Sequence, residues 1–233
     1  MIERLTIAVG DIHGHADKLV SLLNHCEKLK AGRPAKYVFL GDYVDRGPTS
    51  RRVMDILMGK QQADPDNVIC LMGDHEEMLL RAADPNCYDR DLVNWFANGG
   101  EQTLESYGIE DPTEIPAGHL EWMKGLRTSF EERHRTFVHA GLRPGIDLAN
   151  QDPHDLLWIR EPFLSFAGDY GTFVVHGHTP VQAPDLRFNR LNLDTGAGWG
   201  RNLSAALFSQ AGCLPTILVN DSGQTARLAS AAS

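Results

Sequence analysis

The sequence lacks the features that mark several specialised protein classes. Its four cysteines show no C-x-x-C or similar spacing, so we interpret them as free thiols and not as a zinc site or a disulfide framework. No apolar run reaches the roughly 18 residues that a membrane-spanning helix requires, and the first residues do not resemble a signal peptide. We therefore expect a soluble, cytoplasmic protein.

Basic residues are also too few to suggest a polyanionic partner. Lysine and arginine number 22 against 31 acidic residues, and the formal net charge is -9. Nucleic acids and anionic membranes call for clustered Lys and Arg. We therefore expect the partners to be proteins or small molecules, with no nucleic acid and no membrane.

A chain of 233 residues that is 42% hydrophobic can bury one sizeable core, which predicts a single domain over residues 1–233. Three apolar runs, at residues 5–9, 37–40 and 68–72, each end in Gly-Asp and precede a helix-like pattern. This is a repeated β-loop-α signature. Loops at the carboxyl ends of neighbouring parallel strands share one edge of a sheet, so we expect the three Gly-Asp units to converge.

The pattern changes along the rest of the chain. Residues 84–132 contain helical segments broken by Pro and Gly, which predicts a mostly helical insert beside the site. Strand signals then return and favour a second sheet in the later part of the chain. The last residues, 228–233, are small and polar, which favours a disordered end.

Asp and His side chains gather at the ends of the predicted strands. A single Asp after Gly is usually a turn residue or a helix N-cap, but three such loops on one edge, joined by histidines at later strand ends, indicate a metal site. Mixed oxygen and nitrogen ligands suit Mn, Fe or Zn better than Ca or Mg. The residues concerned are Asp11, His13, Asp42, Asp45, Asp74, His75, His139, His176 and His178.

The motifs GDIHG, GDYVDRG, GDHE, HAGL and HGHTP occur in the order found in the phosphoprotein phosphatase family of calcineurin-like metallophosphoesterases, and they closely resemble its bacterial and phage serine/threonine phosphatase branch. The motifs span residues 10–180. The resemblance implies an α/β fold, namely a four-layer α/β/β/α sandwich with a binuclear metal centre at the sheet edges. Two cations there would lower the pKa of a shared water and make hydroxide available as the nucleophile.

The resemblance also implies ligands for two divalent metal ions, with manganese favoured and iron or zinc as alternatives. By position in the motifs, the first metal would be bound by Asp11, His13 and His178 and the second by Asp74 and His139, with Asp42 bridging them. Composition alone does not separate His176 from His178. Family position favours His178, and His176 is expected to face the other way on its strand.

The same resemblance assigns roles to four further residues. His75 would be the general acid that protonates the leaving alkoxide, and Asp45 would hydrogen-bond its imidazole and favour the cationic form. Arg46 and Arg160 would bind the phosphate through paired guanidinium donors. The role of Arg160 is inferred from the segment LLWIRE, which resembles a Trp-x-Arg element of the family. The alternative is that Arg160 forms a surface salt bridge.

Asp74 departs from the family pattern, which has asparagine at this position. Two divalent cations balanced by Asp11, Asp42 and a hydroxide leave a net charge of about +1, whereas an ionised Asp74 brings it to about zero and weakens the attraction for phosphate. The sequence therefore predicts retained metals with a turnover below that of an Asp74→Asn variant. The alternative is that Asp74 only caps the following helix.

Three functions agree with these residues. The first is a phosphoprotein phosphatase that acts on serine or threonine phosphate, or alternatively on tyrosine phosphate, so that its partner would be a phosphorylated protein or a small phosphoester. The second is a dinucleoside polyphosphate hydrolase, which the GDIHG motif disfavours because that branch typically resembles GDxQG there. The third, which only Asp74 supports, is a weakly active homologue that binds phosphorylated partners.

Overall fold

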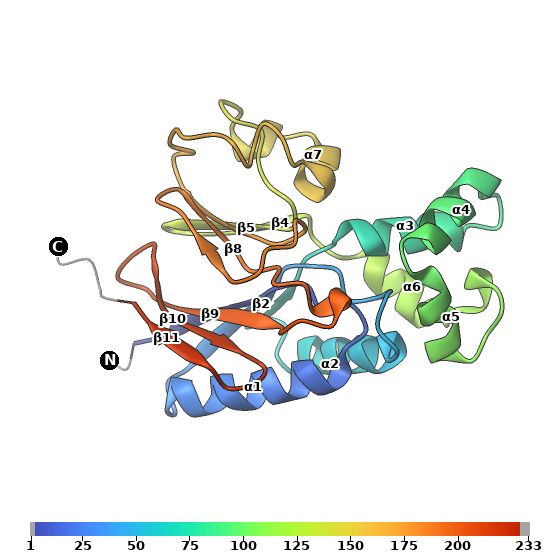
Figure 1. The fold of residues 1–233 in the computed structure, drawn as a ribbon, viewed down its shortest axis with the longest axis horizontal. Helices are drawn as coiled ribbons and strands as arrows, with labels where there is room; N and C mark the ends of the chain where they lie inside the picture. The colour runs from blue at the N-terminus through green and yellow to red at the C-terminus, as the bar shows by residue number, and fades with distance from the viewer. Residues whose placement is uncertain (1–2, 229–233) are drawn as a thin grey trace.

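The computed structural model describes residues 3–228, so the expected disordered end falls almost wholly outside the described residues. Two β-sheets lie face to face, and helices cover their outer faces (Figure 1). This confirms the predicted four-layer α/β/β/α sandwich. No helix within the described part of the chain is both long and apolar enough to cross a membrane.

The first sheet has a parallel centre with an antiparallel extension. β1, β2 and β3 run parallel, and β9 joins β1 in the antiparallel direction. The strand order is β11 (Thr225–Arg227), β10 (Pro215–Asn220), β9 (Ser204–Ser209), β1 (Leu5–Val9), β2 (Ala35–Phe39) and β3 (Val68–Cys70).

The second sheet also has a parallel centre, formed by β5, β6 and β8, with an antiparallel strand at each edge. The strand order is β4 (Ser129–Glu132), β5 (Arg135–Val138), β6 (Phe173–His176), β8 (Arg190–Asn192) and β7 (Asp185–Leu186). Apolar side chains of both sheets, such as Val38 and Phe137, form the core between them.

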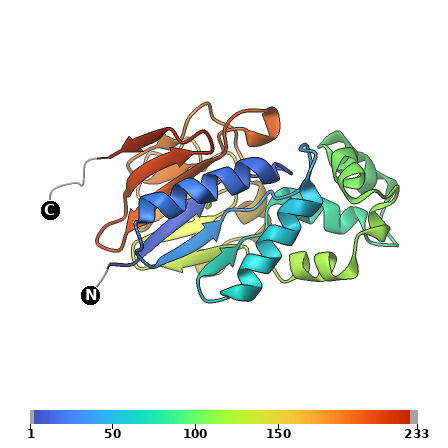
Figure 2. The ribbon, with the colours of Figure 1, turned by 90° about the horizontal axis from the view of Figure 1, so that it is seen from below.

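The helices that follow β1 and β2 cover the outer face of the first sheet. They are α1 (Ala16–Lys30) and α2 (Ser50–Ala63), which lie side by side across that face (Figure 2). α1 buries Leu19, Leu22 and Cys26, whose three- and four-residue spacing places them on one helix face. On the other side of the molecule, α7 (Pro153–Trp158) and the nearby η2 (Leu148–Asn150) cover the second sheet.

The residues of the predicted insert are mostly helical, but the helices end at Lys124, before the predicted boundary. α3 (Asp74–Ala82) leads into α4 (Asp89–Ala97), α5 (Gly100–Tyr107), η1 (Pro112–Glu114) and α6 (Ala117–Lys124), which project beyond the sheets (Figure 1). The last residues of the predicted insert instead form β4. The sequence pattern missed this strand because it is four residues long and is defined by its pairing with β5.

The strands predicted at residues 5–9, 37–40 and 68–72 lie within two residues of β1, β2 and β3, but the assignment of the later strands to a second sheet was partly wrong. β9, β10 and β11 complete the first sheet, because β9 pairs with β1 across about 200 residues of chain. Such non-local pairing depends on tertiary packing and leaves no local signal in the sequence.

A candidate binuclear metal centre

The loops that follow five parallel strands converge at one edge of the two sheets, as the sequence predicted. Asp11, Asp42 and Asp74 follow β1, β2 and β3, and His139 and His178 follow β5 and β6. All are buried. Together with His13 and His75 they form three groups, in each of which the ligand atoms lie within 4.8 Å of one another: His13-Asp42-His75, Asp74-His139-His178 and Asp11-Asp42-His139. Asp42 and His139 each belong to two groups, and for Asp42 this agrees with a bridging position.

His178 lies between the two predicted ligand sets. Its Nδ1 donates to Asp74 Oδ1 at 2.8 Å, and His139 Nε2 donates to the same oxygen at 2.8 Å. The backbone N–H of His178 donates to Asp11 Oδ2 at 2.9 Å. The assignment of His178 to the first metal therefore stays a prediction, since its side chain contacts a ligand of the second.

Asp74 is not the cap of the helix that it begins. The N-cap of α3 is Gly73, and the Asp74 side chain instead accepts hydrogen bonds from two histidines. Burial favours the neutral acid, but the hydrogen bonds from His139 and His178 outweigh it and hold the Asp74 pKa well below its usual value. The capping alternative was therefore wrong, and Asp74 is an ionised member of the cluster.

The carboxylates around His139 favour a positively charged group, a proton or a metal ion, at its Nε2. Its Nδ1 donates to Leu40 O at 2.8 Å, which fixes the ring and leaves Nε2 facing the carboxylates. Burial favours the neutral ring, but Asp42, Asp74 and Asp11 raise the pKa of His139 well above its usual value. A metal ion would take the place of the proton that these carboxylates attract.

Buried negative charge also favours cation binding near Asp11. Burial and then repulsion from Asp194 raise the pKa of Asp11 well above its usual value. Asp11 Oδ1 and His178 Nε2 are buried and have no hydrogen-bond partner among the described residues. A Cβ at Gly177 would lie 1.9 Å from Asp11 Oδ1, so only glycine leaves this oxygen its space. These carboxylate and imidazole atoms fit divalent Mn, Fe or Zn.

His13 presents a neutral imidazole to the same cluster. Its Nδ1 donates to Val44 O at 3.0 Å, and its Nε2 accepts a hydrogen bond from Arg46 Nη1 at 2.6 Å. Burial, followed by repulsion from His75 and Arg46, lowers the His13 pKa well below its usual value. Arg46 therefore lies directly against a predicted ligand, and a metal at His13 Nε2 would replace this hydrogen bond.

His75 and Asp45 form the predicted ion pair. His75 Nδ1 lies 2.7 Å from Asp45 Oδ2, and both side chains are buried. Trp95 Nε1 and Thr103 Oγ1 also donate to Asp45, at 3.0 Å and 2.7 Å, and hold its carboxylate in place. Burial opposes the charged ring, but Asp42 and the hydrogen-bonded Asp45 raise the His75 pKa to about 9. Neither Trp95 nor Thr103 carries a sequence signal for this role.

Backbone strain is concentrated at this cluster. Only six non-glycine residues in the described part of the chain have positive φ angles, and five belong to the site: His13, Asp42, Asp45, Arg46 and His178. Such conformations cost free energy, and they persist where the surrounding structure enforces them, often at functional sites. The strained backbone conformations of these loops therefore orient the side chains toward the cluster.

Two buried acids with structural roles were missed by the sequence analysis. The Glu76 carboxylate accepts hydrogen bonds from the backbone N–H groups of Asp42, Tyr43 and Gly73 at 2.7–2.9 Å and so joins the second and third loops. Its place three residues after the helix N-cap was the available signal. Asp194 follows β8 as the other acids follow their strands, and it accepts from Gly196 N.

The remaining candidates lie around the centre. His176 faces away from the cluster, as expected, because its ring packs on that of Phe163, with 4.8 Å between the ring centroids. Burial lowers the pKa of His176 to about 3. Arg160 is exposed, and no ion pair or hydrogen bond of its side chain occurs among the described residues. Its neighbour Trp158 lies 6.3 Å from the ring of His178. The phosphate-binding role of Arg160 therefore stays a prediction.

Comparison with known proteins identifies the family. The model of the calcineurin-like phosphoesterase family matches residues 5–182. The chain therefore belongs to this family, which confirms the resemblance seen in the motifs, and it is a metal-dependent phosphoesterase.

Curated relatives are similar over most of their length. A protein of Halalkalibacterium halodurans named asymmetrical bis(5'-nucleosyl)-tetraphosphatase PrpE is 26% identical, with 87% of this chain and 89% of the relative covered. A Bacillus cereus protein of the same name is 27% identical with the same coverage.

Solved structures share the fold. A cold-active protein-tyrosine phosphatase of a Shewanella species has a TM-score of 0.65 and 18% identity, covering 98% of this chain and 81% of that one. A protein serine/threonine phosphatase of Saccharomyces cerevisiae has a TM-score of 0.64 and 16% identity, covering 99% and 82%. At these identities the likeness concerns the fold alone.

Proposed function

We propose that the chain hydrolyses dinucleoside polyphosphates by cleaving a phosphoanhydride bond. The observation that carries this proposal is the similarity to relatives named as bis(5'-nucleosyl)-tetraphosphatases, which extends over 87% of the chain. The Asp and His cluster supports the chemistry, because it brings together seven side chains that include the six predicted ligands of two cations. The preference for manganese and the cytoplasmic location stay predictions.

The chain's own residues supply binding, positioning and a proton. Asp11, His13, Asp42, Asp74, His139 and His178 would hold the two metals, which supply a reactive hydroxide and Lewis-acid stabilisation of the phosphate. Arg46, at the edge of the cluster, would bind a non-bridging phosphate oxygen through its planar guanidinium. His75 would donate a proton to the leaving oxygen, and Asp45 holds the ring in orientation.

The sequence analysis ranked a phosphoprotein phosphatase first, and the relatives favour its alternative. The GDIHG motif was a weak guide because Asp11 and His13 in it are predicted metal ligands, and both kinds of hydrolase need a metal centre. Substrate choice also depends on side chains around the centre that lie outside the motifs.

Phosphomonoester hydrolysis remains the second candidate because of the His75–Asp45 pair. A serine or threonine alkoxide is a strong base and departs slowly without a proton, whereas a phosphate leaving group is weakly basic. A buried imidazole whose pKa is raised to about 9 suits the more demanding leaving group. This geometry supports a protein or other monoester substrate.

The deciding experiment compares turnover on diadenosine tetraphosphate, a phosphoserine peptide and a phosphotyrosine peptide, with Mn, Fe and Zn supplied in turn. A kcat/KM for the dinucleotide at least tenfold above both peptides supports the proposal. A preference for either peptide overturns it in favour of the second candidate. Tight peptide binding without turnover of any substrate would support the weakly active homologue.

A further inference from the structure

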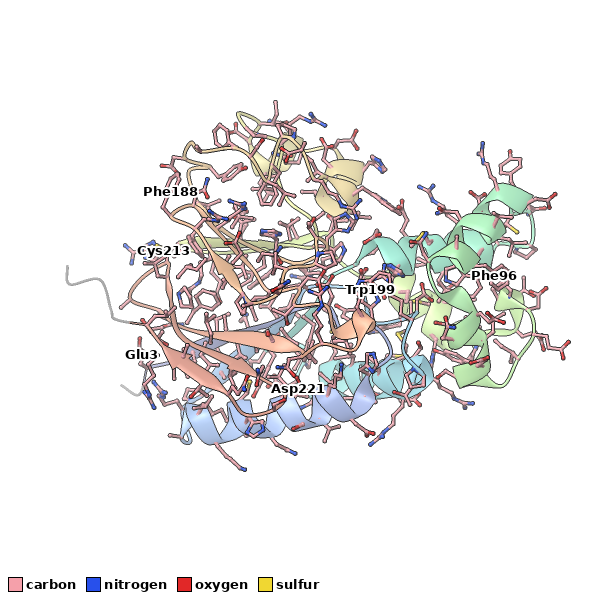
Figure 3. The ribbon with its side chains drawn as sticks, viewed as in Figure 1. Glu3, Phe96, Phe188, Trp199, Cys213 and Asp221 are labelled. Atoms are coloured by element: carbon pink, nitrogen blue, oxygen red, sulfur yellow. The ribbon has the colours of Figure 1, made fainter. Side chains whose placement is uncertain are left out.

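Trp199 is an aromatic side chain exposed beside the metal centre. It ends η3 (Ala197–Trp199), and 61% of its surface is accessible to solvent. Figure 3 shows it on the side of the sheets that faces the helical insert. A single exposed aromatic ring is common on proteins and by itself indicates nothing. Its contacts are what distinguish it.

The Arg46 guanidinium lies between Trp199 and His13, a predicted metal ligand. The Arg46 guanidinium carbon lies over the indole ring, 4.8 Å from its centroid, and Arg46 Nη1 donates to His13 Nε2. A Cβ at Gly198 would lie 2.8 Å from His13 Cδ2 and 2.9 Å from Arg46 Cδ, so this loop packs directly on both residues. A phosphate bound at Arg46 would therefore have the indole as its neighbour.

The loop that carries the ring is fixed at both ends. Gly196 and Gly200 flank η3 with φ angles of 80° and 79°, which favour glycine. The Asp194 carboxylate accepts from Gly196 N at 2.9 Å, and Lys18 Nζ donates to Ala197 O at 3.3 Å. The indole is thus presented on a preorganised turn, which lowers the entropic cost of using it to bind a ligand.

We propose that Trp199 is the stacking surface for one nucleobase of the substrate, while Arg46 binds the phosphate nearest to that nucleoside. This inference rests on the proposed function and names the nucleobase subsite of the same centre. Arg46 covers one face of the indole, and the high exposure of the residue leaves its other face accessible to a planar base. Stacking tolerates any base because each has a π-face, so the subsite selects nucleotides over base-free phosphates.

The test measures binding, so that it does not depend on turnover. The affinities of AMP and of inorganic phosphate are determined by calorimetry for the Mn-loaded wild type and for Trp199→Ala. We expect the variant to bind AMP about tenfold more weakly, as the loss of one base–aromatic stack predicts, and to bind phosphate as the wild type does. Trp199→Phe should retain most of the AMP affinity.

Phe188→Ala is the matched control. Phe188 is also aromatic and 68% exposed, but it lies on the side of the second sheet away from the insert (Figure 3). This variant should bind AMP normally. Unchanged AMP affinity in Trp199→Ala, or an equal loss of AMP and phosphate affinity, would overturn the inference.

Two further outcomes separate the inference from the proposed function. If the wild type prefers phosphopeptides in turnover but Trp199→Ala still loses AMP affinity selectively, the proposed function fails and the base subsite stands. If the variant loses affinity for a phosphotyrosine peptide and not for AMP, the ring serves a tyrosine substrate and the inference is wrong.

Discussion

Asp45 Oδ2 lies 2.7 Å from His75 Nδ1, and both side chains are buried. The carboxylate is held from behind by the Trp95 indole N–H and the Thr103 hydroxyl. These contacts fix the direction of the imidazole, so its Nε2 points toward the metal cluster, 4.0 Å from Asp42 Oδ2. Asp45 thus positions the proposed acid, His75, without needing to touch the substrate.

Replacing Asp45 by Asn should shift the alkaline limb of the kcat profile to lower pH. His75 acts as an acid only when protonated, so activity falls as the pH rises through its pKa, which Asp42 and Asp45 raise to about 9 against the effect of burial. Removing the Asp45 charge lowers that pKa, by roughly one unit or more. Thr103→Val keeps the charge and should shift the limb much less. Coincident limbs for wild type and Asp45→Asn would contradict the assigned role.

Replacing His75 by Gln should affect substrates according to their leaving groups. Loss of a general acid typically costs about 10²- to 10⁴-fold for an alkoxide such as serine. We expect less than about a tenfold loss of kcat for a nitrophenyl ester or a phosphoanhydride, whose leaving groups are weaker bases and depend less on the proton from His75. Steady-state kinetics on the three substrates measure this difference. A uniform loss would show that His75 acts mainly through the metal site.

Replacing Asp74 by Asn should raise turnover. The change removes one negative charge next to the phosphate site and restores a net positive centre. An interaction of about 1 kcal/mol between screened charges at contact distance corresponds to roughly a fivefold increase in rate. Assays at saturating Mn measure it, and a parallel metal titration checks that both proteins are fully loaded. Equal or lower turnover in the variant would refute the charge argument.

Gly177→Ala should weaken metal binding and leave the fold intact. The new Cβ would lie 1.9 Å from Asp11 Oδ1 and displace a ligand oxygen. Gly59→Ala is the control, because its Cβ meets no atom within 4 Å on α2 and should add about 0.5–1 kcal/mol of stability. Metal binding to the native state raises the melting temperature. We therefore expect Mn to raise it less in Gly177→Ala than in Gly59→Ala, and equal increases would contradict the prediction.

The parallel part of the fold could be predicted because each unit is local. An apolar run followed by Gly-Asp and a three-and-four pattern defines β1-α1 and β2-α2 within about 30 residues each, and the carboxyl ends of such strands share an edge. β4 and the pairing of β9 with β1 could not be predicted in this way. They depend on partners elsewhere in the chain.

The sequence by itself determined which residues could bind metals, because carboxylate and imidazole chemistry belongs to the side chains and their motifs fix the strand ends on which they lie. Only the tertiary structure decided how they are used. It turned Asp74 toward His139 and His178, placed Trp95 behind Asp45 and set Trp199 against Arg46. The physical reason is that a pKa, an ion pair or a stacking surface depends on distances of a few ångströms between groups, and only packing brings distant segments that close.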